Sequence, residues 1–109
     1  MAAVYSAPLF SGSVAAGAVT LFTVPSGYVY VVRDVTLWNA QPFMTIIGGG
    51  FIIDNHNGVV FAVADQEAVP QRYYHWSGHQ AIATGDQLLA EFGHSSWLVR
   101  VSGYKLTTP

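Results

Sequence analysis

Four histidines are the residues of this sequence with the most versatile chemistry, because neutral imidazole is the commonest metal ligand in proteins. They are His56, His75, His79 and His94. Two histidines of one strand can converge on a metal as a His-x-His pair, since alternate side chains share one face, and the sequence contains no such pair. His75 and His79 are four residues apart, a spacing that joins two ligands only on a helix, and Gly78 between them indicates a turn. We therefore expect no metal ligand and no cofactor, and interpret the histidines as isolated surface or loop residues.

The carboxylates and serines also lack the pattern of an active site. The acidic residues outside the central strand pattern are Asp54, Asp65, Glu67, Asp86 and Glu91. Most of them fall in expected turns, where an Asp side chain accepts hydrogen bonds from backbone N–H groups, whereas a glycosidase needs two carboxyl groups facing each other across a cleft. Ser6, Ser26 and Ser77 lie outside any nucleophile elbow, and the glycines at 48–50 are not followed by the Lys-Ser/Thr of a phosphate loop. We therefore expect no catalytic residue and no enzyme activity.

The aromatic side chains allow two interpretations. Tyr73, Tyr74 and Trp76 form one run, and Trp38 and Trp97 stand elsewhere in the chain. Exposed planar rings on a β-sandwich can hold sugar rings, as they do in many carbohydrate-binding modules. Alternatively, the rings fill the core and a subunit interface, where Tyr and Trp are enriched. Because the sequence carries so few charges, we favour the second interpretation and name Trp38, Tyr74 and Trp76 as candidate interface residues.

Two arginines, Arg33 and Arg100, each stand inside an apolar strand pattern. A charged side chain is rarely buried without a partner. We therefore expect both at an interface or in buried ion pairs, with Asp34 and Glu91 as their partners.

The sequence is poor in charge. Charged residues make up 9% of the 109 residues and hydrophobic residues 51%, whereas an ordinary soluble domain is roughly 25% charged. So few charges cannot cover the outside of a monomer of this size, and we expect part of the surface to be buried against copies of the chain or against other proteins. The net charge of −2, with four Lys and Arg residues, predicts that nucleic acid is not a partner. The absence of cysteine excludes disulfides and thiolate chemistry.

A membrane partner is not expected either. Residues 1–32 contain no charged side chain, but Pro8, Gly12, Gly17 and Pro25 interrupt this run. Each uninterrupted piece falls far short of the roughly 20 apolar residues of a spanning helix. The first residues also lack the basic side chains of a secretory signal.

Residues 24–39, VPSGYVYVVRDVTLWN, carry the longest strand signal of the chain. Pro25 fixes φ and Gly27 can adopt a positive φ, so that a turn opens the strand at Tyr28. Beyond it Tyr, Val, Thr and Trp dominate, which are the residue types that suit a pleated, half-buried surface. Neither set of alternate side chains is polar throughout, so we expect this strand to be covered on both faces, in the middle of a β-sandwich.

The rest of the chain reads as short strands between turns, without a convincing helix. We expect a strand at 43–47, the clearest turn at Asn57-Gly58 and an exposed loop at 65–71. About eight or nine strands at spacings near 8 to 12 residues predict one all-β domain over residues 1–109, a β-sandwich of jelly-roll type. The expected core consists of Val29, Val31, Val35, Leu37, Phe61, Leu88, Phe92, Val99 and Val101.

Four segments together resemble the small structural proteins of tailed-phage virions. They are VPSGYVYVVRDV at 24–35, WSGHQ at 76–80, TGDQL at 84–88 and VRVSGYKLTTP at 99–109. Residues 42–71 take no part in this likeness. The resemblance implies a compact β-sandwich located on the virion, either as capsid decoration or as a minor or fibre component of the tail, and commonly a trimer.

Three functions remain open at this point. The first is a virion structural protein that assembles with itself, as a trimer, and attaches to other capsid or tail proteins. The second is a carbohydrate- or receptor-binding module of a phage tail, with a host glycan as its partner. The third is a metal-dependent enzyme of the cupin type, which the missing His-x-His disfavours. The low fraction of charged residues favours the first function, that of a virion structural protein.

Overall fold

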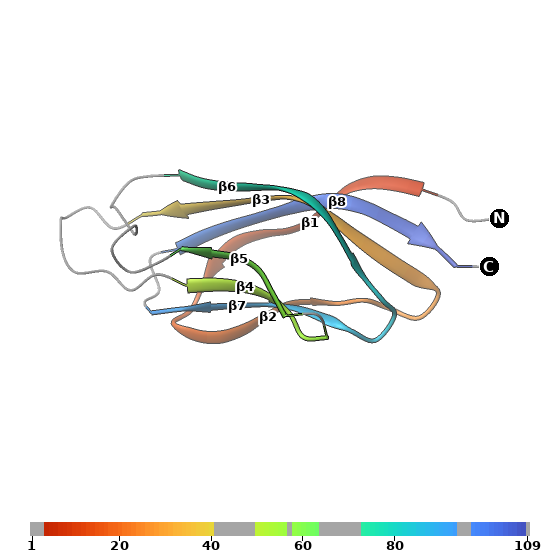
Figure 1. The fold of residues 1–109 in the computed structure, drawn as a ribbon, viewed down its shortest axis with the longest axis horizontal. Coiled ribbons are helices and arrows are strands. Elements are labelled where there is room, and N and C mark those ends of the chain that lie inside the picture. The colour runs from red at the N-terminus through yellow and green to blue at the C-terminus, as the bar shows by residue number, and fades with distance from the viewer. Residues whose placement is uncertain (1–3, 41–49, 57, 64–72, 94–96, 109) are drawn as a thin grey trace.

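The computed structural model describes residues 4–40, 50–56, 58–63, 73–93 and 97–108 (Figure 1). The strand expected at 43–47, the loop expected at 65–71 and His94 lie outside these residues. Within them the chain forms eight strands, and no helix long enough to cross a membrane is present. The strands are β1 (Val4–Val14), β2 (Gly17–Thr23), β3 (Tyr28–Asn39), β4 (Gly50–Asp54), β5 (Gly58–Val63), β6 (Tyr73–Ile82), β7 (Gln87–Phe92) and β8 (Trp97–Thr107).

The eight strands form two four-stranded antiparallel sheets. Sheet A has the order β1-β8-β3-β6, and sheet B has the order β2-β7-β4-β5. Successive strands therefore cross between the sheets, except for the β4–β5 hairpin, and this connectivity is that of a jelly roll. Figure 1 shows the two sheets face to face, with both termini at one end of the sandwich. The predicted all-β, jelly-roll-like sandwich is confirmed.

The core lies between the two sheets. Six of the nine residues expected there are buried, namely Val35, Leu37, Leu88, Phe92, Val99 and Val101. Phe61 is partly buried and packs against this cluster. Trp97 of sheet A is fully buried and stacks on Phe92 of sheet B, with ring centroids 5.0 Å apart. The ring centroid of Tyr74, also from sheet A, lies 5.8 Å from that of Trp97. The end of the sandwich at which β8 begins is thus filled by aromatic rings.

A β-bulge interrupts β3 at Arg33. Val32 pairs with Gly103 of β8 and Asp34 pairs with Ser102, so Arg33 is an extra residue with no counterpart on β8. Such an insertion kinks the strand and reverses which alternate positions face the core. Gly103 lies directly opposite the bulge, where the backbones of the two strands approach closely. A Cβ atom built on Gly103 would lie 1.9 Å from the carbonyl oxygen of Val31.

The bulge explains why part of the predicted core was wrong. A straight strand would point Val29 and Val31 to the same side as Val35. In the structure Tyr30 and Val32 are buried before the bulge, whereas Val29 and Val31 are only partly buried. The period-two pattern holds on each side of Arg33, but its phase changes there.

A buried carboxylate links the two sheets. Asp54, at the end of β4, has no exposed surface. Its Oδ2 accepts a hydrogen bond of 2.9 Å from the Gln80 amide of β6, and its Oδ1 accepts one of 2.9 Å from the backbone N–H of His56. Buried carboxylates are tolerated when they are hydrogen-bonded in this way. Asp54 therefore has a structural place in the fold.

Candidate functional site

The outer faces of the two sheets differ in chemistry. Residues that pair across antiparallel strands point to the same side, so the outer face of sheet A can be read from the strand registers. One row across the sheet joins Ser11, Arg100, Thr36 and His75, and the next joins Ser102, Asp34 and Ser77. The middle of this face is therefore polar, and it carries charges of both signs.

Four polar side chains of β3 and β6 form one hydrogen-bonded network on this face. The Ser77 hydroxyl donates to Oδ1 of Asp34 at 2.9 Å. His75 Nε2 lies 2.8 Å from Ser77 Oγ and 3.3 Å from Asp34 Oδ1. The other ring nitrogen, Nδ1, lies 3.0 Å from Thr36 Oγ1. The His75 and Asp34 side chains are 52% and 48% exposed, so the network is in contact with water.

The network contains the residue types of a serine hydrolase but not its arrangement. In a catalytic triad the serine donates to the imidazole, and the carboxylate binds the other ring nitrogen. Here Ser77 donates to Asp34 directly, and Nδ1 of His75 contacts Thr36. The order of the three groups is thus not that of a catalytic triad. The geometry instead fixes the side chains of a polar surface.

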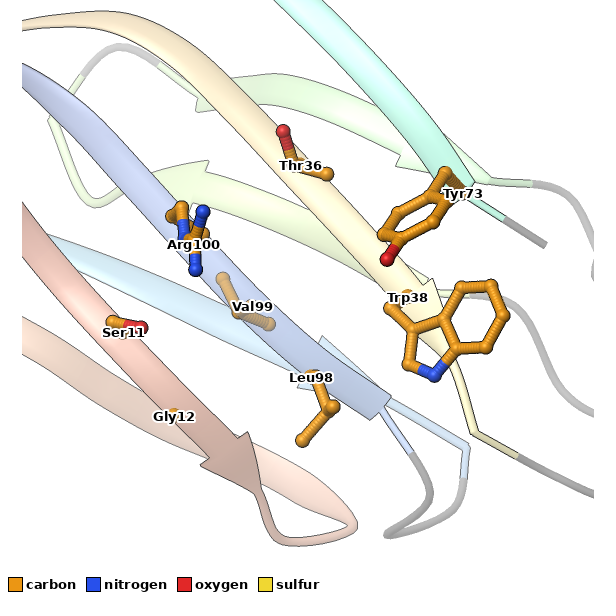
Figure 2. Close-up of a pocket in the computed structure, with 8 residues that line it drawn as sticks. All are labelled: Ser11, Gly12, Thr36, Trp38, Tyr73, Leu98, Val99 and Arg100. Carbon is orange, nitrogen blue, oxygen red and sulfur yellow. The ribbon is translucent and has the colours of Figure 1, made fainter. Parts of the chain in front are cut away.

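A pocket of about 310 Å³ lies beside this network on the outer face of sheet A (Figure 2). We call it the aromatic pocket; all four strands of the sheet contribute to its lining, which consists of Ser11, Gly12, Thr36, Trp38, Tyr73, Leu98, Val99 and Arg100. Trp38 and Tyr73 form one wall of it, with ring centroids 4.5 Å apart and planes inclined by 41°. The volume is at the lower end of the roughly 300–1,000 Å³ of small-molecule sites.

The outer face of sheet B is apolar by contrast. Two rows across it are Ala18-Glu91-Phe51-Ala62 and Thr20-Leu89-Ile53-Val59. Phe51 is 43% exposed and Val59 is 60% exposed. Among the described residues of this face, Glu91 alone is charged. The period-two pattern could have revealed this face, because Phe51 and Ile53 alternate with the buried Ile52.

The three candidate interface residues do not share one surface. Trp38 lines the aromatic pocket on the outer face of sheet A. Tyr74 and Trp76 instead point from β6 towards sheet B, where both are partly buried against the core. Their contribution to an interface stays a prediction, whereas Trp38 stands on an accessible surface. Tyr73, which belongs to the same aromatic run but was not named as an interface residue, is 68% exposed beside Trp38.

Among the described residues, neither Arg33 nor Arg100 forms the ion pair that we expected. Arg33 donates to the Tyr104 hydroxyl at 3.4 Å, and its guanidinium carbon lies 5.5 Å from that ring's centroid, a cation–π contact. Asp34 is bonded to Ser77 and His75 instead of Arg33. Arg100 is exposed in the aromatic pocket, and no carboxylate in the described ranges forms an ion pair with it.

Three histidines lie within the described residues, at separate places. His56 is in the exposed turn between β4 and β5, and His75 and His79 lie on the outer face of β6. The turn predicted at Gly78 was wrong, because β6 runs through it without a break. No three His, Asp or Glu side chains in the described part of the chain gather closely enough to hold a metal ion.

Comparisons with protein-family models, with curated proteins and with solved structures find no match to this chain.

Proposed function

We propose that this chain is a structural protein of a tailed-phage virion, which assembles with copies of itself through the outer face of sheet B and attaches to other particle proteins. It would serve as capsid decoration or as a minor tail component. The observation that carries the proposal is the contrast in charge between the two outer faces: sheet A presents rows with charges of both signs beside the aromatic pocket, whereas Glu91 alone is charged among the described residues on the outer face of sheet B. The assignment to a virion rests on the resemblance of residues 24–35 and 99–109 to structural proteins of tailed phages.

The outer face of sheet B is suited to burial in an assembly. Its exposed apolar side chains, Phe51 and Val59, lie on adjacent strands and continue into the half-buried Ile53 and Leu89. Exposure of these side chains to water costs a free energy of about 25 cal/mol per Å² of apolar surface. Burial against another copy removes this penalty and has to accommodate one charge, that of Glu91, which lies in the same row as Phe51.

A second copy of the chain is the occupant that the composition favours. A partner recognised by charge would need complementary groups, and this face offers almost none. A closed ring buries one patch against the next copy and leaves none exposed, and a trimer is the ring that the resemblance implies. In such a ring the outer face of sheet A, with the aromatic pocket, stays accessible.

The outer face of sheet B can be tested with Val59→Lys. Val59 is 60% exposed on β5, an edge strand of its sheet, so lysine is tolerated in the isolated fold. In an assembly the ammonium group would be buried, and we expect the dissociation constant to rise at least about tenfold. Sedimentation velocity at micromolar concentration should show a trimer for the unmodified chain and a monomer for V59K.

Ala81→Lys is the matched control, because Ala81 is an exposed strand residue on the outer face of sheet A. It adds the same charge and should leave the trimer unchanged. Equal sedimentation of V59K and the unmodified chain, or dissociation by A81K alone, would contradict assembly through sheet B. An unmodified chain that stays monomeric at every concentration would contradict self-assembly altogether.

A further inference from the structure

The lining of the aromatic pocket combines an apolar wall with a few polar groups. Trp38, Tyr73 and Leu98 supply hydrophobic surface, and Tyr73 and Leu98 are 68% and 43% exposed. Thr36 and Ser11 add hydroxyl groups from the strands on either side of β8. Figure 2 shows the two rings rising on one side of β8, with Ser11 and Gly12 on the other.

This mixture matches the surface of a sugar ring. A pyranose has C–H groups that pack on an aromatic plane, and hydroxyl groups around its rim that exchange hydrogen bonds with hydroxyls and guanidinium groups. Indole and phenol rings are large, rigid and amphipathic, so they bind such a ligand with little loss of conformational freedom. A purely apolar ligand would leave Ser11 and Arg100 without compensation for their lost water.

The charge of the pocket further restricts the class of ligand that it can bind. Arg100 is the one charged residue in its lining. Among the residues that the structure describes, the nearest acidic side chain on this face, Asp34, is one row away and already accepts a hydrogen bond from Ser77. The pocket therefore has positive charge to offer, and a guanidinium group binds a carboxylate through two parallel hydrogen bonds.

We propose that the aromatic pocket binds a saccharide unit that carries a carboxylate, with the sugar ring against Trp38 and Tyr73 and the carboxylate on Arg100. The site does not depend on the outer face of sheet B, because the two faces lie on opposite sides of the sandwich (Figure 1). A chain held in a particle through sheet B would present this pocket outward.

Calorimetric titration of the full chain with a trisaccharide of galacturonic acid, and with the neutral galactose trisaccharide of the same linkage, tests the proposal. In buffer of physiological ionic strength, the acidic sugar should bind about tenfold more tightly, as expected for one charge-assisted interaction. Arg100→Gln should abolish this preference, so that the acidic sugar binds no more tightly than the neutral one. Trp38→Ala should weaken both sugars about tenfold or more, because it removes the stacking surface.

His79→Ala is the control, since His79 is exposed on β6 but does not line the aromatic pocket. It should bind both sugars as the unmodified chain does. The proposal is overturned if neither sugar binds, if R100Q weakens both equally, if H79A loses as much affinity as W38A, or if polyglutamate competes as well as the acidic sugar. V59K should retain sugar binding, so failure of the sugar site and failure of self-assembly are separate results.

Discussion

Replacing Gly103 with alanine is expected to lower the free energy of unfolding by about 3 kcal/mol, the upper end of the usual cost of overpacking. The added methyl group would lie 1.9 Å from the carbonyl oxygen of Val31 and 3.1 Å from the backbone nitrogen of Arg33. These are backbone atoms of the β3 bulge and cannot turn aside. β8 also lies between β1 and β3, so it cannot shift without disturbing two strand pairings. Urea denaturation followed by circular dichroism measures the loss.

Gly12→Ala provides the matched control for this substitution. Gly12 is also a strand residue of sheet A, but a Cβ there would meet only the Phe10 ring, at 3.8 Å, an ordinary contact. We expect its effect to stay within about 0.5 kcal/mol. If the two variants lose equal stability, the close approach of β8 to the bulge is not the reason for glycine at position 103.

Replacing Trp97 with alanine is expected to cost about 4 kcal/mol, in the range measured for large aromatic side chains in cores. The indole is fully buried between Phe92 of sheet B and Tyr74 of sheet A. Its removal leaves a cavity where both sheets meet, and the chain carries no larger core side chain to fill it. Thermal unfolding by differential scanning calorimetry, with urea denaturation as a check, measures the effect.

Trp38→Ala changes the same side chain on the outside of the sandwich. Its ring packs on Tyr73 at the surface and is only partly buried, so we expect a loss of about 1 kcal/mol or less. The contrast separates a core tryptophan from a binding tryptophan. A loss for W38A as large as that for W97A would mean that Trp38 supports the fold, and its use as a ligand contact would lose its basis.

The turns and strands of the fold could be predicted because their signals are local. Gly27, Gly58 and Gly85 all adopt positive φ, of 85°, 102° and 84°, in or beside the turns that the sequence places there. Alternation between turns was enough to locate most strands and two thirds of the expected core. The phase change at Arg33 could not be seen in this way, because a bulge depends on how β3 pairs with β8, which follows more than sixty residues later.

The polar network on sheet A was missed for a related reason. Asp34 and Ser77 are 43 residues apart, and only the β3–β6 register brings them together. The same holds for Trp38 and Tyr73, which form the wall of the aromatic pocket from two strands. The residue types indicated two possible roles, sugar binding and a subunit interface. Assigning these roles to opposite faces of the sandwich requires the strand order.

The most direct test of this division between faces uses the absence of cysteine from the sequence, since one introduced thiol is then unique. Val59→Cys places it on the outer face of sheet B, and Ala81→Cys on the outer face of sheet A; both positions are exposed in the single chain. At micromolar concentration we expect the V59C thiol to react with a maleimide at least about tenfold more slowly than the A81C thiol, because assembly covers it. The difference should disappear on dilution, and equal rates for the two thiols at every concentration would contradict the account.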